Sequence, residues 1–97
     1  MRDVRLTEGA EEDYTESLCW YANRSTYAAE GFQSEFERAL GAISANAQRY
    51  PHCDNRHQFY LLTRYPYLII YRQESENACL IVAVAHAKRS PGYWQNR

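Results

Sequence analysis

The feature that most constrains the fold is a run of apolar residues at helical spacing between positions 26 and 50. The residues recur at steps of three and four, and they are Ala29, Phe32, Phe36, Ala39, Leu40, Ile43, Ala47 and Tyr50. This spacing predicts an amphipathic helix that Ser25 or Thr26 caps and that Pro51 ends, because proline lacks the N–H that a helix needs. Its apolar face needs a sheet as well as a second helix to cover it.

A strand and a shorter helix are predicted before this long helix. Residues Val4–Leu6 alternate like a short strand, and Thr7 is placed to cap a helix. Apolar residues then recur at helical spacing, at Ala10, Tyr14, Leu18, Tyr21 and Ala22. Five acidic residues lie between Glu8 and Glu16. We predict that they form a solvated face favoured by the helix dipole, and not a set of catalytic carboxylates.

The second half of the chain is rich in strand-forming residues. Three runs dominated by Tyr, Ile, Leu and Val cover Phe59–Thr63, Tyr67–Arg72 and Cys79–His86. The connections between them are short and suit hairpins. The sequence therefore predicts one α+β domain over residues 1–97 with the order β-α-α-β-β-β. Two antiparallel N-terminal helices should pack on a small, mainly antiparallel sheet, followed by a tail over residues 87–97.

The net charge of −1 hides an asymmetry between the two halves. Residues 1–50 carry five basic and nine acidic side chains, whereas residues 51–97 carry six basic and three acidic ones. An acidic partner is therefore expected at the second half. The N-terminus lacks the apolar stretch of a signal peptide, and no apolar run reaches the roughly 20 residues that span a bilayer. We expect a cytoplasmic protein that does not enter a membrane.

Several residues that often carry chemistry have a simpler interpretation. A cluster of metal-donor types comprises His52, Cys53, Asp54 and His57, but it matches no zinc-ligand spacing, so we predict a polar loop. Cys–His nucleophile pairs are conceivable in Cys53 with His57 or Cys79 with His86, yet no third group orients them. We expect the three cysteines to be packing thiols, and we predict neither a metal nor a cofactor.

The segment from His86 to Arg97 is the strongest functional candidate. It sets one histidine, three cations and two aromatic rings just beyond a buried strand, at His86, Lys88, Arg89, Tyr93, Trp94 and Arg97. Arginine forks and aromatic faces suit acidic groups or phosphates, and the same residue types anchor protein interfaces. The alternative is that Tyr93 and Trp94 fold back as a lid on the sheet.

Several motifs together resemble the RelE/ParE toxin superfamily across nearly the whole chain. They are Trp20-Tyr21, the run Phe32-x3-Phe36-x3-Leu40-x2-Ile43 ending at Tyr50-Pro51, the strand start Tyr65-Pro66-Tyr67, and the strand-to-tail pattern His86-x-x-Arg89-x-Pro91-x-Tyr93-Trp94. The resemblance implies the same β-α-α-β-β-β fold. It also implies a toxin of a bacterial type II toxin–antitoxin system, also known as a plasmid stabilisation protein, which a cognate antitoxin neutralises by wrapping around it.

The resemblance implies two different targets, because the superfamily has two branches. The RelE branch cleaves messenger RNA on the ribosome with lysines and arginines on the sheet and a tyrosine in the tail. The ParE branch poisons DNA gyrase without a recognised catalytic centre. Here the positions of the sheet cations correspond to Phe59, Leu61, Leu68 and Ala87, and only the tail tyrosine, Tyr93, remains.

We therefore predict a ParE-like, non-enzymatic toxin that inhibits gyrase through the end of its last strand and its tail. Two alternatives stay open. One is a ribosome-dependent endoribonuclease in which His86, Arg89 and Tyr93 form a non-standard catalytic set, with histidine as the base. The other is a degenerate toxin that retains only antitoxin binding.

Overall fold

The computed structural model describes residues 1–89 and 92–97 of the chain. Two residues of the strand-to-tail segment, Ser90 and Pro91, lie outside the described residues. The elements are β1 (Asp3–Leu6), α1 (Glu8–Ala22), α2 (Thr26–Asn46), a 3-10 turn η1 (Ala47–Arg49), β2 (Gln58–Leu61), β3 (Tyr67–Ser75) and β4 (Ala78–His86). This order confirms the predicted α+β class and the sequence of strands and helices.

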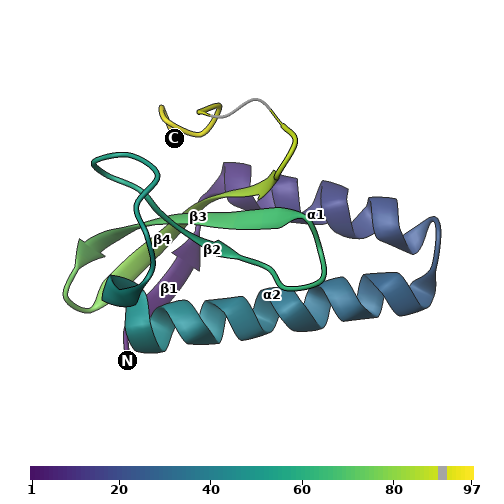
Figure 1. The fold of residues 1–97 in the computed structure, drawn as a ribbon, viewed down its shortest axis with the longest axis horizontal. Coiled ribbons are helices and arrows are strands. Elements are labelled where there is room, and N and C mark those ends of the chain that lie inside the picture. Colours follow the sequence, from purple (N-terminus) through teal and green to yellow (C-terminus); the bar gives the residue numbers. More distant parts are fainter. Residues whose placement is uncertain (90–91) are drawn as a thin grey trace.

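The strands form one sheet in the order β1-β4-β3-β2. The pairs β2–β3 and β3–β4 are antiparallel, and β1 lies parallel to β4. The sheet is therefore mainly antiparallel, as predicted. The helices α1 and α2 form a hairpin that packs against the sheet, and the C-terminal segment lies across the sheet from α2 (Figure 1). This places the end of β4 and the tail on a side of the molecule that α2 does not cover.

The sequence explains where the helices begin and end. Thr7 and Ser25 accept hydrogen bonds from the N–H groups of Ala10 and Ala28, so both predicted caps are confirmed. The helical pattern was expected to run to Pro51, but α2 ends at Asn46 and a 3-10 turn follows.

At the end of α2 the Ser44 carbonyl accepts a hydrogen bond from the N–H of Arg2 at 3.0 Å, and the carbonyl of Ala47, just beyond the helix, has partners in the sheet. An α-helical bond to that carbonyl would have to come from residue 51, which is a proline without an N–H. The Gln58 amide, at 2.8 Å, and the Tyr71 hydroxyl, at 2.5 Å, donate to it instead. The carbonyl is thus satisfied by β2 and β3, which ties the end of the long helix to the sheet.

Phe32 is the centre of the core between the helices and the sheet. Its side chain is fully buried, and its ring lies 5.2 Å from that of Tyr21 and 5.1 Å from that of Tyr67, centroid to centroid. Tyr14 and Tyr65 complete the ring of aromatic neighbours at 5.8 and 5.5 Å. Tyr14 and Tyr21 of α1 and Phe32 of α2 therefore pack in the core.

Glu35 on α2 fixes the turn between β2 and β3. Its carboxylate is only 4% exposed, and it accepts hydrogen bonds from the N–H groups of Thr63 and Arg64 and from the Arg64 guanidinium at 2.8 Å. Desolvation by itself raises the pKa of Glu35, but the bonds from Arg64 and Thr63 and the charge of Arg64 outweigh it. The pKa is held below the ordinary value of 4.5.

Replacing Glu35 with alanine is expected to lower the free energy of unfolding by about 2 kcal/mol, because two backbone donors lose their acceptor. Since the folded pKa is the lower one, the stabilisation is complete above about pH 4.5 and is lost as the pH falls through the folded value. The difference between wild type and variant in urea unfolding should therefore shrink on acidification. The matched control is Glu37→Ala, on the exposed side of the same helix. If both variants lost the same free energy of unfolding, the role of Glu35 in fixing the turn would be contradicted.

Some details differ from the prediction. β3 runs to Ser75, three residues further than expected, so the hairpin to β4 turns through residues 76 and 77 alone. Of the three thiols only Cys79 is buried; Cys19 and Cys53 are exposed, so the prediction that they pack inside was wrong for these two. Among the described residues, no helix has the length and apolar character needed to cross a membrane.

Candidate functional site

The C-terminal tail is packed onto the sheet through Trp94. This side chain is 7% exposed and belongs to a second apolar cluster with Ile70, Val82, Ala83 and Ala85. Successive residues of a strand point to opposite faces, and the neighbours Ile69, Tyr71 and Val84 belong to the helix-side core, so this cluster lies on the other face of the sheet. Gly92, with φ of +91°, provides the left-handed backbone that begins this last segment. The predicted alternative, a lid formed by Trp94, is what the structure shows.

The carboxylate of Asp13 on α1 binds two further residues of the tail. It is 6% exposed and accepts hydrogen bonds from the Tyr93 hydroxyl at 3.0 Å and from Arg97 Nη1 at 2.8 Å. The N–H of Val84 in β4 donates to the same oxygen at 3.1 Å. Asp13 therefore joins three segments that are far apart in the sequence: the first helix, the last strand and the tail.

Asp13 was predicted to lie on a solvated acidic face, and this was wrong. The prediction holds for its neighbours Glu8, Glu11, Glu12 and Glu16, which are exposed. Asp13 lies on the face of α1 that turns toward β4, like Ala10 three residues earlier and Ser17 four residues later, which are buried. That spacing was visible in the sequence, but the arginine that compensates the buried charge lies 84 residues away.

The backbone of β4 after Ile81 needs hydrogen-bond partners other than β1. Asp13 and Arg97, with Tyr93, supply them, and we call these three residues the Asp13 clamp. β1 pairs with β4 only as far as Ile81, and the register with β3 shifts at the next residue, so Val82 forms a bulge. The Val82 carbonyl accepts from Arg97 Nη1 at 2.9 Å and from the Thr7 hydroxyl at 3.4 Å. The side chains of Asp13, Thr7 and Arg97 thus bind the backbone groups of Val82 and Val84, which β1 is too short to reach.

The cations of the tail lie around the ring of Tyr93. The guanidinium carbon of Arg89 is 3.8 Å from the ring centroid, and that of Arg97 is 5.1 Å away. Burial, followed by the charge and the hydrogen bond of Asp13, raises the pKa of Tyr93 above its ordinary value. The Tyr93 phenol therefore stays protonated and donates to Asp13. Lys88 and Arg89 are exposed, whereas Tyr93 and Arg97 are partly buried.

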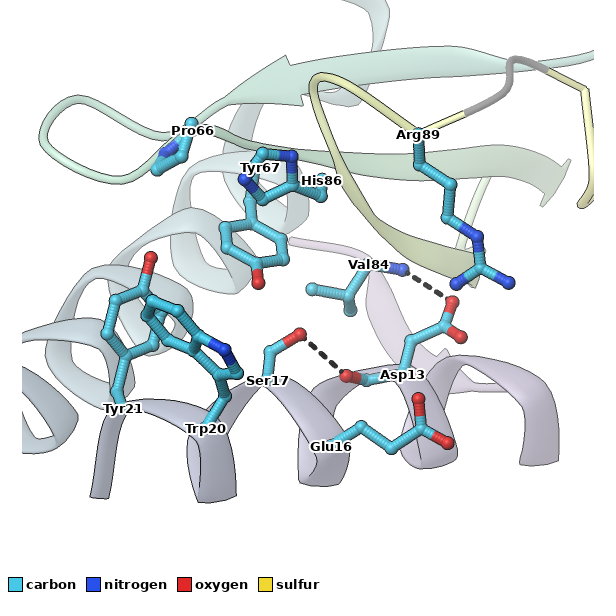
Figure 2. Close-up of a pocket in the computed structure, with 10 residues that line it drawn as sticks. All are labelled: Asp13, Glu16, Ser17, Trp20, Tyr21, Pro66, Tyr67, Val84, His86 and Arg89. Carbon is cyan, nitrogen blue, oxygen red and sulfur yellow. Dashed lines mark hydrogen bonds between the residues drawn. The ribbon is translucent and has the colours of Figure 1, made fainter. Parts of the chain in front are cut away.

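A groove of about 490 Å³ runs beside this clamp, between α1 and the ends of β3 and β4 (Figure 2). Asp13 and Arg89 line one end, and Trp20, Tyr21 and Tyr67 line the other. Trp20 is 50% exposed, and the Arg24 guanidinium stacks on its ring at 3.6 Å. The remaining lining residues are Glu16, Ser17, Pro66, Val84 and His86. The groove combines an aromatic end with an acidic rim, which suits a peptide with apolar and basic side chains.

His86 ends β4 and lines the same groove, with its ring centroid 5.1 Å from that of Tyr67. Its Nδ1 accepts a hydrogen bond from the N–H of Lys88 at 3.1 Å. In a neutral imidazole with Nδ1 as the acceptor, Nε2 carries the proton. Nε2 is then a donor, and Nδ1 is already occupied. This arrangement disfavours His86 as a general base.

The sheet positions that carry cations in RelE-type enzymes are apolar side chains on an accessible part of the molecule. Leu61 is 58% exposed, Ala87 is exposed, and Phe59 and Leu68 are partly buried. Phe59 and Leu68 also line a second cavity of about 520 Å³ beside Trp94. None of these four side chains can supply a positive charge to a cleaved phosphodiester.

The predicted polar loop before β2 is held together internally. Asp54 accepts hydrogen bonds from the N–H groups of Arg56 and His57 and from the His57 ring at 3.0 Å. The Cys53 thiol donates a hydrogen bond to the His57 backbone carbonyl at 3.5 Å. Burial, followed by the negative charge of Asp54, raises the pKa of this thiol. A raised pKa is the opposite of what a nucleophilic cysteine needs. Within residues 1–89 and 92–97, no group of three or more donors is arranged to hold a metal ion.

The structure thus gathers the predicted site residues at one end of β4, but in different roles. Lys88 and Arg89 face solvent, Tyr93 and Arg97 are clamped by Asp13, and Trp94 is an internal anchor. Direct contact of Trp94 with a partner would require the tail to lift. The contribution of each of these residues to binding remains a prediction.

Comparisons with known proteins agree with this architecture. The family model described as "ParE toxin of type II toxin-antitoxin system, parDE" matches residues 4–91. A solved structure entitled "Chromosomal ParDE TA system from P. aeruginosa" superposes with a TM-score of 0.76 and 14% sequence identity. The alignment covers 91% of this chain and 98% of that one. At this identity the likeness shows the fold. No curated protein matches the sequence.

Proposed function

Because this chain belongs to the family of ParE toxins of type II toxin–antitoxin systems, we propose that it inhibits DNA gyrase and that a cognate antitoxin neutralises it. Both partners are cytoplasmic, so the protein acts in the cytoplasm, and such a pair stabilises the replicon that carries it. The observation that carries the proposal is the clamped tail, which presents the exposed cations Lys88 and Arg89 beside an apolar sheet surface.

The geometry favours a binder over a nuclease. An in-line RNA cleavage needs a base for the 2′-hydroxyl, cations at the phosphate and an acid for the leaving oxygen. His86 has Nδ1 occupied by the N–H of Lys88, and the Tyr93 phenol donates to Asp13. Arg89, the third member of the alternative catalytic set, stacks on Tyr93. All three groups are therefore already engaged in contacts within the protein.

The test uses protein freed of its antitoxin in two parallel assays. In a supercoiling assay, the protein is expected to inhibit gyrase or to trap a cleaved DNA complex. In a ribosome-programmed assay, messenger RNA should stay intact. RNA cleavage without an effect on gyrase would favour the endoribonuclease alternative. Growth arrest with no effect in either assay would indicate another target, and failure to arrest growth would indicate a degenerate toxin.

We further propose that the antitoxin occupies the groove beside α1. Trp20 is the largest accessible aromatic side chain along this groove, and the exposed carboxylate of Glu16 on its rim complements a basic segment. Replacing Trp20 with alanine is expected to weaken antitoxin binding roughly 30-fold, as for a central interface tryptophan. Isothermal titration of the purified partners measures this change.

The matched control for Trp20→Ala is Tyr27→Ala. Tyr27 is 83% exposed and does not line the groove, so its loss should leave the affinity within about twofold, the usual outcome for residues outside a hot spot. Equal affinity of both variants and wild type would place the antitoxin elsewhere. That result would leave the gyrase proposal untouched, since the two surfaces are tested separately.

A further inference from the structure

We propose that Asp13 is the positioning residue of the tail: its buried carboxylate fixes Tyr93 and Arg97, so that Lys88 and Arg89 meet the target in one arrangement. The functional part of this inference rests on the proposed function, because it assumes that the tail is the target-binding surface. The structural part is independent of which target is bound. Asp13 is 6% exposed, so it acts through the tail and not by contact.

The contacts of Asp13 divide between the body and the tail. Val84 N donates from the body, whereas Tyr93 and Arg97 donate from the tail. Arg97 is fastened further by its bond to the Val82 carbonyl and by a 3.3 Å bond from Arg72 to its own carbonyl. A charge buried in this way is held by specific partners, and removal of any one of them leaves polar groups unsatisfied.

A glycine in α1 makes room for this clamp. A Cβ atom added at Gly9 would lie 2.6 Å from the guanidinium carbon and from Nε of Arg97. Real atoms do not approach so closely, so the guanidinium must shift in Gly9→Ala, and we expect this shift to weaken its bond to Asp13. Alanine is otherwise favoured over glycine inside a helix. Gly9→Ala is therefore expected to loosen the clamp while leaving Asp13, Tyr93 and Arg97 in the sequence.

Arg89 is linked to the clamp through the ring of Tyr93. Its guanidinium stacks on that ring at 3.8 Å, and the Tyr93 hydroxyl is bonded to Asp13. If Asp13 is replaced, Tyr93 loses the acceptor that sets the ring orientation. Arg89 then loses a fixed platform, because its contact to the clamp runs through the Tyr93 ring. This is how a buried residue on α1 determines the arrangement of an exposed cation.

The structural test measures the fluorescence of Trp94. Because the chain has two tryptophans, it uses a Trp20→Phe background in which Trp94 is the only one. Asp13→Asn and Gly9→Ala are each expected to shift Trp94 emission to longer wavelength. They should also speed hydrogen exchange at the Gln95 and Arg97 amides roughly tenfold or more, as for loss of a charge-assisted bond. Glu11→Gln, an exposed neighbour with the same charge change, is the control. Unchanged emission and exchange in both variants would overturn the clamp.

The functional test measures activity per folded molecule. Asp13→Asn and Gly9→Ala should need about tenfold more protein for half-inhibition of gyrase, at a temperature where thermal unfolding shows both to be folded. Arg97→Lys, which keeps a cation for Asp13, should retain most of the activity that Arg97→Gln loses. A purely structural role would lower the unfolding midpoint but leave activity per folded molecule unchanged.

Two outcomes separate this inference from the proposed function. If wild type arrests growth but leaves gyrase active, the gyrase proposal fails, and Asp13 is then assessed by growth arrest alone. If Asp13→Asn and Gly9→Ala release the tail yet remain fully toxic while Arg97→Gln is inactive, positioning by Asp13 is refuted, because Arg97 then acts as a direct contact.

Discussion

Replacing Lys88 and Arg89 together by glutamate is expected to raise the concentration needed for half-inhibition of gyrase by about 100-fold or more, because charge reversal at a contact surface adds repulsion to the lost attraction. Both residues are exposed, and neither is a ligand of the Asp13 clamp. The fold should therefore survive, with an unchanged circular dichroism spectrum. Titration of purified protein in a supercoiling assay measures the effect.

The matched control reverses two cations elsewhere. Arg38 and Arg49 are exposed on α2 and η1, so Arg38→Glu with Arg49→Glu changes the net charge by the same amount. This variant should inhibit gyrase within about threefold of wild type, because it alters only long-range electrostatics. Equal loss in both double variants would mean that overall charge governs the activity, and the tail would no longer be the contact surface.

Phe32→Ala should be the most damaging single substitution in the helix-side core. The side chain is fully buried among four tyrosine rings, so truncation removes a large apolar group and leaves a cavity. The expected cost is about 3–5 kcal/mol of unfolding free energy. A domain of this size has only about 5–15 kcal/mol in total. The midpoint of urea unfolding should fall steeply, and toxicity should decrease with the folded fraction.

Tyr27→Ala provides the comparison for Phe32→Ala. Tyr27 lies on the same helix but is 83% exposed, so its loss should change the unfolding free energy by about 0.5 kcal/mol or less. A cost at Phe32 close to that at Tyr27 would show that the aromatic cluster contributes little. The core would then be stabilised mainly by the sheet residues Ile69, Tyr71 and Ile81.

Most of the fold was predictable because it depends on local patterns. The helix periodicity around Phe32, the caps at Thr7 and Ser25 and the β-rich runs after Pro51 each specify their own element. Where the prediction failed, a distant residue decided the outcome. The carbonyl of Ala47, just beyond α2, is bound by Gln58 and Tyr71, and no local pattern indicates these partners.

The candidate site was predictable in composition but not in roles. The cations and rings after His86 were evident, and so was the choice between an exposed patch and a lid for Trp94. What the sequence could not reveal is the burial of Asp13, because four of its acidic neighbours are solvated and its partner Arg97 is at the other end of the chain. Burial of a charge depends on tertiary pairing, which sequence spacing does not encode.

The short β1 strand has a consequence for how the protein behaves in a crowded cell. β4 extends beyond β1, and an uncovered strand edge is a template onto which another chain can add a strand. Asp13 and Arg97 take up the N–H of Val84 and the carbonyl of Val82, the groups that such an incoming strand would use. Arg97 of the tail therefore covers the Val82 carbonyl at this edge, and we expect a protein without its tail to aggregate more readily than wild type.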